Sequence, residues 1–239
     1  MQQNVKVYNN YINGEWVSSV TGELYDSINP ARTSEVLGRF QKSSVEDVRN
    51  AIAAAKAAFP SWANTPAPKR GEVIFNLIRL LEDHKEELAV LITKEVGKAI
   101  RNARGEVDKT IEAMKQFSGE ATRLAGETLP SYREDIFAYT MREPLGVVGV
   151  IAPYNFPLGI GIWKIAPAII AGNTVVFKPA STTSLISVKL VELFEKAGVP
   201  AGVINMVTGS GSVIGKEFGE NEELKAVSFT GSTDVGIAI

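Results

Sequence analysis

A long, almost uncharged stretch from residue 146 to residue 181 dominates the hydrophobic pattern of the chain, with Lys164 as its only charge before Lys178. The pattern predicts a buried strand, a turn at residues 153–157, a mostly apolar helix and a second buried strand that ends at Lys178. Strands that are apolar throughout are typical of a parallel sheet covered on both faces. We therefore expect a catalytic or nucleotide site just beyond the carboxyl ends of these strands.

Amphipathic helices are predicted upstream of this stretch. One begins after a cap at Ser43 or Ser44 and should end at Pro60. Others are expected after Pro66, over residues 85–96 with Gly97 just past the end, and over residues 98–124, with charges on the face away from the sheet. Nearer the start, residues 11–17 and 24–28 predict a small antiparallel hairpin joined by a turn at residues 18–22.

Residues 126–144 break the helical pattern. They hold a β-prone run from Ile136 to Met141 between charged pairs, and we expect this segment to protrude; an edge strand of the same domain is the alternative. Downstream, two more units of strand, glycine-bearing turn and helix begin near residues 203 and 226. The spacing of the strands fits right-handed crossovers, so the fold class expected is α/β with an open parallel, Rossmann-like sheet and flanking helices.

Composition narrows the classes of function. The chain has 239 residues with 25 basic and 27 acidic residues and no strongly basic block, which argues against nucleic acid as a partner. It has no cysteine, and its single histidine, His84, lies at an expected helix boundary, so no metal site is expected. Glycines and prolines interrupt residues 144–163 too often for a membrane span, and the first 16 residues do not resemble a signal peptide. A cytoplasmic protein is the expectation.

Two polar residues stand at the ends of the apolar strands. Asn155 is held between Pro153 and Pro157, and a rigid amide can donate a hydrogen bond to an oxyanion; the alternative is an asparagine that only satisfies the turn backbone. Lys178 ends the second strand, where its ammonium can hold the ribose of a nucleotide or simply reach solvent. Lys164, within the helix, is expected to snorkel or to pair with a carboxylate.

Glycine-bearing turns follow the two later strands, at Gly209-x-Gly211 and at Gly231-Ser232-Thr233. Such turns let backbone amides approach a pyrophosphate, which the next helix N-terminus attracts. The second turn departs from the G-x-G-x-x-G pattern because Thr233 replaces a glycine. Tight turns, with Ser232 as a simple helix cap, are the alternative.

Three motifs, Pro153 to Pro157, Phe177 to Ser181 and Phe229 to Thr233, together resemble the amino-terminal part of the NAD(P)-dependent aldehyde dehydrogenase superfamily. The resemblance implies an incomplete NAD(P)-binding domain over residues 1–125 and 145–239, an arm at residues 126–144 that pairs with another subunit, and an absent catalytic domain. It also implies that Asn155 is the oxyanion donor and that the cofactor is bound by Ala152, Pro153, Lys178, Ala180, Ser181, Gly211, Phe229, Gly231, Ser232 and Val235.

The resemblance further implies a catalytically incomplete chain. The family uses a cysteine nucleophile and a glutamate base in a downstream Glu-Leu-Gly-Gly motif, and neither is present. We expect the amino-terminal part of an enzyme, a homodimer or tetramer when complete, that oxidises an aldehyde or semialdehyde to a carboxylate with NAD(P)+. A stand-alone nucleotide-binding or assembly module, or a relative that forms acyl-CoA or reduces acyl phosphates, is the alternative.

Two departures from the family pattern concern specificity. Tyr154 stands where family members usually have tryptophan, which alters the expected shape of the substrate tunnel. Ser181 stands where members that prefer NAD+ often have a glutamate, which would repel the 2′-phosphate of NADP+. The expected cofactor is therefore NAD(P)+, with a leaning toward NADP+.

Overall fold

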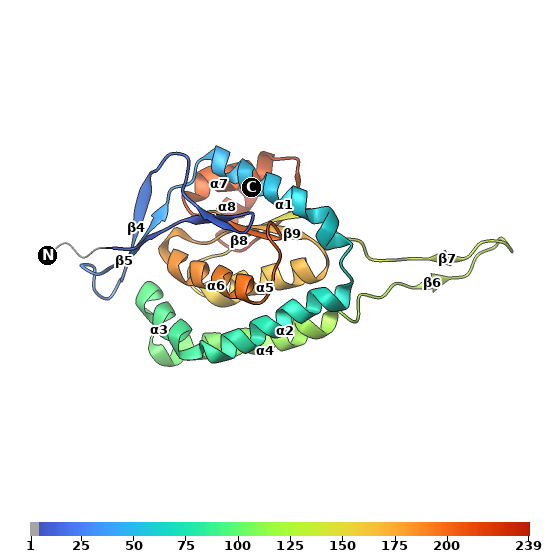
Figure 1. The fold of residues 1–239 in the computed structure, drawn as a ribbon, viewed down its shortest axis with the longest axis horizontal. Coiled ribbons are helices and arrows are strands. Elements are labelled where there is room, and N and C mark those ends of the chain that lie inside the picture. Colours follow the sequence, from blue (N-terminus) through green and yellow to red (C-terminus); the bar gives the residue numbers. More distant parts are fainter. Residues whose placement is uncertain (1–4) are drawn as a thin grey trace.

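The computed structural model describes residues 5–239 and has a mixed six-stranded sheet at its centre (Figure 1). The order of its strands is β11 (Leu224–Phe229), β8 (Val147–Ile151), β9 (Thr174–Lys178), β10 (Ile204–Met206), β2 (Asn10–Ile12) and β3 (Glu15–Val17). The first four of these pair in parallel, and the last two add antiparallel. The expected α/β fold class is confirmed.

Helices cover both faces of this sheet (Figure 1). One face carries α1 (Val45–Ala63), α7 (Gly211–Glu220) and α8 (Thr233–Ala238). The other carries α5 (Pro157–Ile170) and α6 (Ser184–Lys196), and outside them lies a further layer of α2 (Ala67–Asp83), α3 (Lys85–Val96) and α4 (Ile100–Glu120). Every residue of β8 and β9 is buried, which explains why these strands do not alternate.

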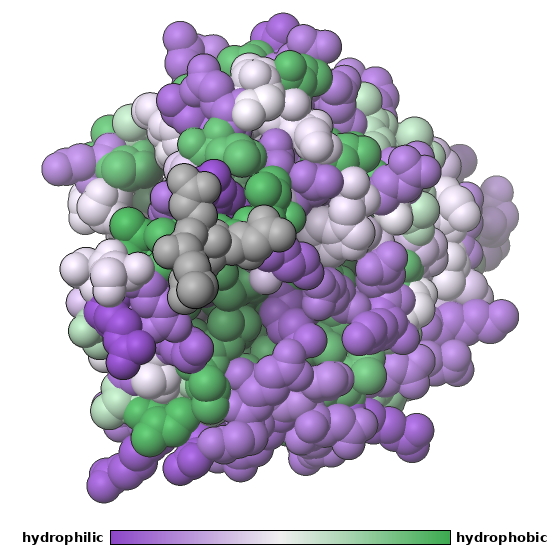
Figure 2. Space-filling view, turned by 60° about the vertical axis from the view of Figure 1, so that its left-hand side comes forward, coloured by the Kyte–Doolittle hydropathy of each residue, from purple (hydrophilic) through white to green (hydrophobic). Residues whose placement is uncertain are grey.

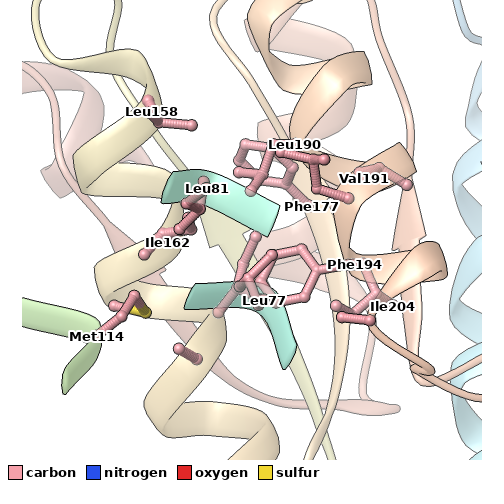
Figure 3. Packing of buried hydrophobic residues seen from close by; sticks show 14 of the residues in the cluster. Leu77, Leu81, Met114, Leu158, Ile162, Phe177, Leu190, Val191, Phe194 and Ile204 are labelled. Carbon is pink, nitrogen blue, oxygen red and sulfur yellow. The ribbon is translucent and has the colours of Figure 1, made fainter. Parts of the chain in front are cut away.

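The larger part of the core lies on the face of the sheet that α5 and α6 cover, and it extends outward to the layer of α2, α3 and α4. Figure 3 shows Phe177 of β9 beside Leu190 of α6, with Leu77 and Leu81 of α2 close to them. Helix α5 is buried from both sides, by the sheet and by α2 and α4. This sandwiching accounts for a helix with apolar residues around most of its circumference.

The amino-terminal strands differ from the sequence prediction. A small hairpin is present, but it lies within residues 10–17, where β2 pairs with β3. Its turn is Asn13-Gly14, with φ of 54° and 81°, the positive values that a two-residue hairpin turn needs. The strand β4 (Leu24–Ile28) pairs instead with β5 (Val36–Gln41), which was not predicted, and β5 also pairs with β1 (Val7–Tyr8).

Helix α1 begins as predicted but ends later. Ser44 and Asp47 form a reciprocal capping box, and Asp47 also accepts a hydrogen bond from Ser19 Oγ at 2.7 Å. Pro60 does not end the helix, which runs on to Ala63. The buried Trp62 donates to the carbonyl of Ile169 at 2.9 Å, and this anchor holds the final turn in place.

The segment at residues 126–144 forms a protruding hairpin (Figure 1). Its strands β6 (Thr128–Leu129) and β7 (Ala138–Tyr139) pair only with each other in a separate two-stranded sheet, so within residues 5–239 the segment protrudes as expected, and the alternative of an edge strand of the core is wrong. The large apolar side chains that it exposes are Leu129, Tyr132, Ile136, Phe137, Tyr139 and Met141. The body is different: the face turned forward in Figure 2 is mostly hydrophilic, with hydrophobic residues in separate groups.

Within residues 5–239, no helix combines the length and the apolar character needed to span a membrane.

Buried carboxylates join several of the helices to neighbouring elements. Glu95 of α3 accepts hydrogen bonds from the backbone N–H groups of Leu185 and Ile186, at 2.6 and 2.8 Å, and from Ser27 Oγ at 3.2 Å. It therefore joins β4 and α3 to the first turn of α6.

Burial of the Glu95 carboxyl raises its pKa from an ordinary 4.5 to about 7, against the effect of the three hydrogen bonds. The native state thus binds this proton more tightly than the unfolded state does. The resulting contribution to stability is complete below pH 4.5 and is lost as the pH rises through about 7. Its full size is ~3 kcal/mol.

We expect the Glu95→Gln variant to lack this pH dependence, because glutamine does not titrate. The free energy of unfolding of wild type minus that of the variant should decrease from pH 4.5 to above pH 7, as measured by urea denaturation. Glu112→Gln, on the exposed face of α4, is the matched control and should follow wild type. Parallel pH profiles for wild type and Glu95→Gln would contradict this account.

Candidate functional site

The carboxyl ends of the parallel strands lie in register along one edge of the sheet. Ile151 at the end of β8 pairs with Lys178 of β9 and with Phe229 of β11. Met206 of β10 pairs with Phe177 of β9. The turns that follow these strands therefore meet at one edge, and the catalytic and cofactor-binding candidates lie in these turns, at the strand ends before them or in the first turns of the helices after them.

Lys178 is buried beside the start of α7. Only 6% of the residue is exposed, and no carboxylate of residues 5–239 lies within ion-pair distance of its ammonium. A Cβ atom added to Gly211, the first residue of α7, would lie 3.7 Å from Lys178 Nζ. Burial lowers the pKa of Lys178. This burial argues against the alternative in which the ammonium of Lys178 reaches solvent.

An anion or a sugar hydroxyl fits the surroundings of Lys178 better than a second protein group does. The N-terminus of α7 carries a partial positive charge, and its cap residue Ser210 makes no side-chain capping bond. A buried ammonium next to that helix end is unfavourable unless a ligand supplies negative charge or acceptors. Gly211 is exposed and has no side chain, so a ligand can approach the backbone there.

Ser181 connects two of the turns at this edge. Its Oγ donates to the carbonyl of Gly209 at 2.8 Å, which ties the turn after β9 to the turn after β10. Gly209 has a φ of 136°, and a Cβ there would lie 2.8 Å from the backbone nitrogen of Ser43. The neighbouring Ala180 is half-buried. Lys178, Ala180, Ser181 and Gly211 thus form one compact region, which we call the lysine subsite.

Asn155 lies in the turn between β8 and α5 and is exposed, next to the buried Ala152 and the half-buried Pro153. Its side-chain amide forms no hydrogen bond with any residue from 5 to 239, so it does not satisfy the turn backbone. Its carbonyl accepts a hydrogen bond from Lys98 Nζ at 2.9 Å. The amide is therefore available to a ligand, and the backbone that carries it is held from outside the turn.

The candidates that follow β11 are more open to solvent. Phe229 is half-buried, whereas Gly231, Ser232 and Val235 are exposed. Ser232 occupies the cap position of α8, but its side chain makes no capping bond. A Cβ on Gly231 would lie 2.4 Å from the Phe229 ring, so a larger residue there would have to displace that ring.

Lys164 was expected to snorkel or to pair with a carboxylate, and it has no carboxylate partner within residues 5–239. Its Nζ donates to Ser228 Oγ of β11 at 3.0 Å, and burial lowers its pKa.

His84 separates α2 from α3, and its Nδ1 lies 2.7 Å from a carboxylate oxygen of Glu87. The described residues hold no cluster of metal-ligating side chains.

Sequence reasoning missed Lys98 and Glu106, which lie next to the Asn155 turn. Both were assigned to the solvated face of a helix, yet Glu106 is 1% exposed and pairs with Lys98. One signal was present: Glu106 falls at helical spacing from Ala103 and Thr110, which are buried on the same face of α4.

The chain is similar to known proteins over nearly its whole length. The sequence model of the Aldehyde dehydrogenase family matches residues 16–239. An alpha-ketoglutaric semialdehyde dehydrogenase of Bacillus subtilis (strain 168) is 44% identical over 229 residues, which are 96% of this chain and 47% of that protein. A malonate-semialdehyde dehydrogenase of the same strain is 45% identical over 232 residues, which are 97% of this chain and 47% of that protein.

Solved structures agree with the fold. An NADP dependent enzyme of E. coli superposes with a TM-score of 0.94 at 38% identity, over 99% of this chain and 49% of that one. A betaine aldehyde dehydrogenase from Staphylococcus aureus, in complex with NAD+, gives 0.94 at 36% identity, over 97% and 46%. The chain spans about half the length of these relatives. On the family match and the shared fold together, the chain belongs to the aldehyde dehydrogenase family.

Proposed function

We propose that this chain is the NAD(P)-binding portion of an aldehyde dehydrogenase that oxidises a semialdehyde or a related aldehyde to a carboxylate. The observation that carries the proposal is the buried Lys178, without an acidic partner in residues 5–239, beside the start of α7. Support for the substrate class comes from the relatives, which are named as semialdehyde dehydrogenases. The dinucleotide, when bound, supplies the acceptor for the hydride of the aldehyde.

In this proposal the chain binds and orients, and it stabilises charge. Lys178 and Ser181 hold the adenosine ribose, and the backbone at Gly211 and Ser232 approaches the pyrophosphate. Ala152, Pro153, Ala180, Phe229 and Val235 complete the contact surface. The Asn155 amide donates to the oxygen of the aldehyde as that oxygen becomes negative, and such a donor stabilises the transition state by ~2.7–4 kcal/mol.

The same proposal assigns the protruding arm, residues 126–144, to the interface with another copy of the chain in a homodimer or tetramer. Its six exposed apolar side chains are hydrophobic surface that such a contact would cover. The remainder, residues 1–125 and 145–239, forms the cofactor-binding domain. We place the protein in the cytoplasm.

A second candidate is a nucleotide-binding or assembly module without catalysis. It is favoured by one observation: the 239 residues contain no cysteine, which the family needs as its nucleophile. Aldehyde-dependent NAD(P)H formation separates the two candidates when it is assayed for the polypeptide that the intact gene encodes and for the 239-residue chain alone. The first candidate requires activity from the intact gene product and none from the chain alone. Dinucleotide binding without turnover by both would favour the second.

We expect Lys178→Met to weaken dinucleotide binding by the 239-residue chain about 10-fold or more, because a hydrogen bond from a charged donor stabilises by ~1.5–3 kcal/mol. Isothermal titration calorimetry with NADP+ measures the change. Lys216→Met is the matched control, since it removes an exposed lysine from α7 that pairs with Glu220. Equal affinities for wild type and Lys178→Met would show that the lysine subsite does not bind the cofactor.

We expect the chain to accept NADP+ and to prefer it, and Ser181→Glu to shift the affinity ratio toward NAD+. A carboxylate at position 181 would lie near the 2′-phosphate of NADP+, where like charges repel in a partly desolvated site. The ratio of the two dissociation constants is measured for wild type and variant, with Ser181→Gln as the uncharged control of similar size. If the glutamate leaves the ratio unchanged, Ser181 does not face the 2′-position.

A further inference from the structure

A buried carboxylate from the outer layer of helices reaches the start of α5. Glu106 of α4 has a side chain that is 0% exposed. Its Oε1 accepts hydrogen bonds from the backbone N–H of Leu158 at 3.1 Å and of Gly159 at 3.5 Å. These N–H groups belong to the first turn of α5 and have no partner within the helix. Glu106 therefore caps α5 from a different helix.

The other oxygen of this carboxylate pairs with Lys98, whose side chain is 16% exposed. Lys98 Nζ also donates to the carbonyl of Asn155 at 2.9 Å and lies 4.9 Å from the centre of the Phe156 ring. Lys98 itself is positioned by the end of α3, where Gly97 turns the chain with a φ of 73°. The ion pair therefore contacts this region at two points. Lys98 binds the last peptide group of the Asn155 turn, and Glu106 binds the first turn of the helix that follows.

The close packing of α4 on this turn reinforces the contact. A Cβ atom on Gly159 would lie 2.2 Å from the Phe156 ring and 3.1 Å from Thr110 Oγ1, so a larger residue there would have to displace the Phe156 side chain and press on α4. The Thr110 hydroxyl is itself bonded to the carbonyl of Glu106 at 2.8 Å. The lysine, the carboxylate and the glycine therefore set the path of the backbone that carries Asn155.

We propose that Lys98 and Glu106 are positioning residues that hold the Asn155 amide in the direction from which it donates to the substrate oxygen. The catalytic part of this statement rests on the proposed function. The amide has no hydrogen bond of its own to residues 5–239, so its direction depends on the backbone beneath it. Because the ammonium of Lys98 is neutralised by Glu106, the pair acts through geometry and not through net charge at the site.

The first test needs no activity and uses the 239-residue chain. The amide N–H of Phe156 belongs to the same peptide group as the Asn155 carbonyl, so its NMR shift reports the bond from Lys98. In Lys98→Met we expect this shift and the two side-chain N–H signals of Asn155 to move. Lys98→Arg, which keeps a cationic donor, should restore both. Lys115→Met, which breaks the exposed pair of α4 with Glu82, should change neither.

The second test measures turnover by the polypeptide that the intact gene encodes. A displacement of about 1 Å in a positioned group can lower the rate about 100-fold. We expect Lys98→Met to lower kcat by about 10- to 100-fold with unchanged affinity for NADP+, and Lys98→Arg to recover most of the loss. Glu106→Gln should behave as Lys98→Met does, and its circular dichroism spectrum shows whether it is folded.

The outcomes separate the two proposals. A wild-type protein that oxidises no aldehyde refutes the proposed function, and the NMR comparison then decides the positioning role alone. Unchanged Phe156 and Asn155 signals in Lys98→Met overturn the inference whatever the activity. A variant that loses only thermal stability, with kcat and both signals as in wild type, would show that the ion pair is purely structural and would equally overturn it.

Discussion

The parallel pairing of β8 with β9 and with β11 is the constraint on which the rest of the molecule depends. In this register Ile151, Lys178 and Phe229 end level with one another, so three turns with different chemistry meet at one edge. The pairing requires crossover helices, and those helices bury both faces of the strands. A shift of one residue would turn every side chain of the shifted strand to the other face of the sheet, and the three strand ends would no longer be level.

Buried charges in this fold lie where one element must hold another. Glu95 joins α3 to the start of α6, and Glu106 joins α4 to the start of α5. Both carboxylates meet backbone N–H groups that a helix start leaves without partners, which offsets part of the cost of burial. Lys178 differs from these two carboxylates, because its buried ammonium has no acidic partner within residues 5–239. That difference is the basis on which we propose that Lys178 binds a ligand.

The sequence predicted the elements with a strong period, and it missed contacts that depend on tertiary structure. Residues 146–178 could be assigned because both strands are apolar throughout, and Gly97 and Ser44 ended and began helices as expected. The partner of β4 could not be predicted, because pairing of distant strands leaves no local signal. Pro60 was wrongly predicted to end α1, because the hydrogen bond from Trp62 to the carbonyl of Ile169 holds the last turn of the helix in place. Asn155 was found by its motif, but its support by Lys98 and Glu106 joins residues about fifty positions apart.

The most direct test of this account is a crystal structure of the 239-residue chain grown with NADP+. The account requires the adenosine ribose within hydrogen-bond distance of Lys178 Nζ, a pyrophosphate over the turns that follow β10 and β11, and the Asn155 amide still without a hydrogen bond to its own turn. A dinucleotide bound elsewhere on the molecule, with Lys178 contacting only protein atoms, would contradict it.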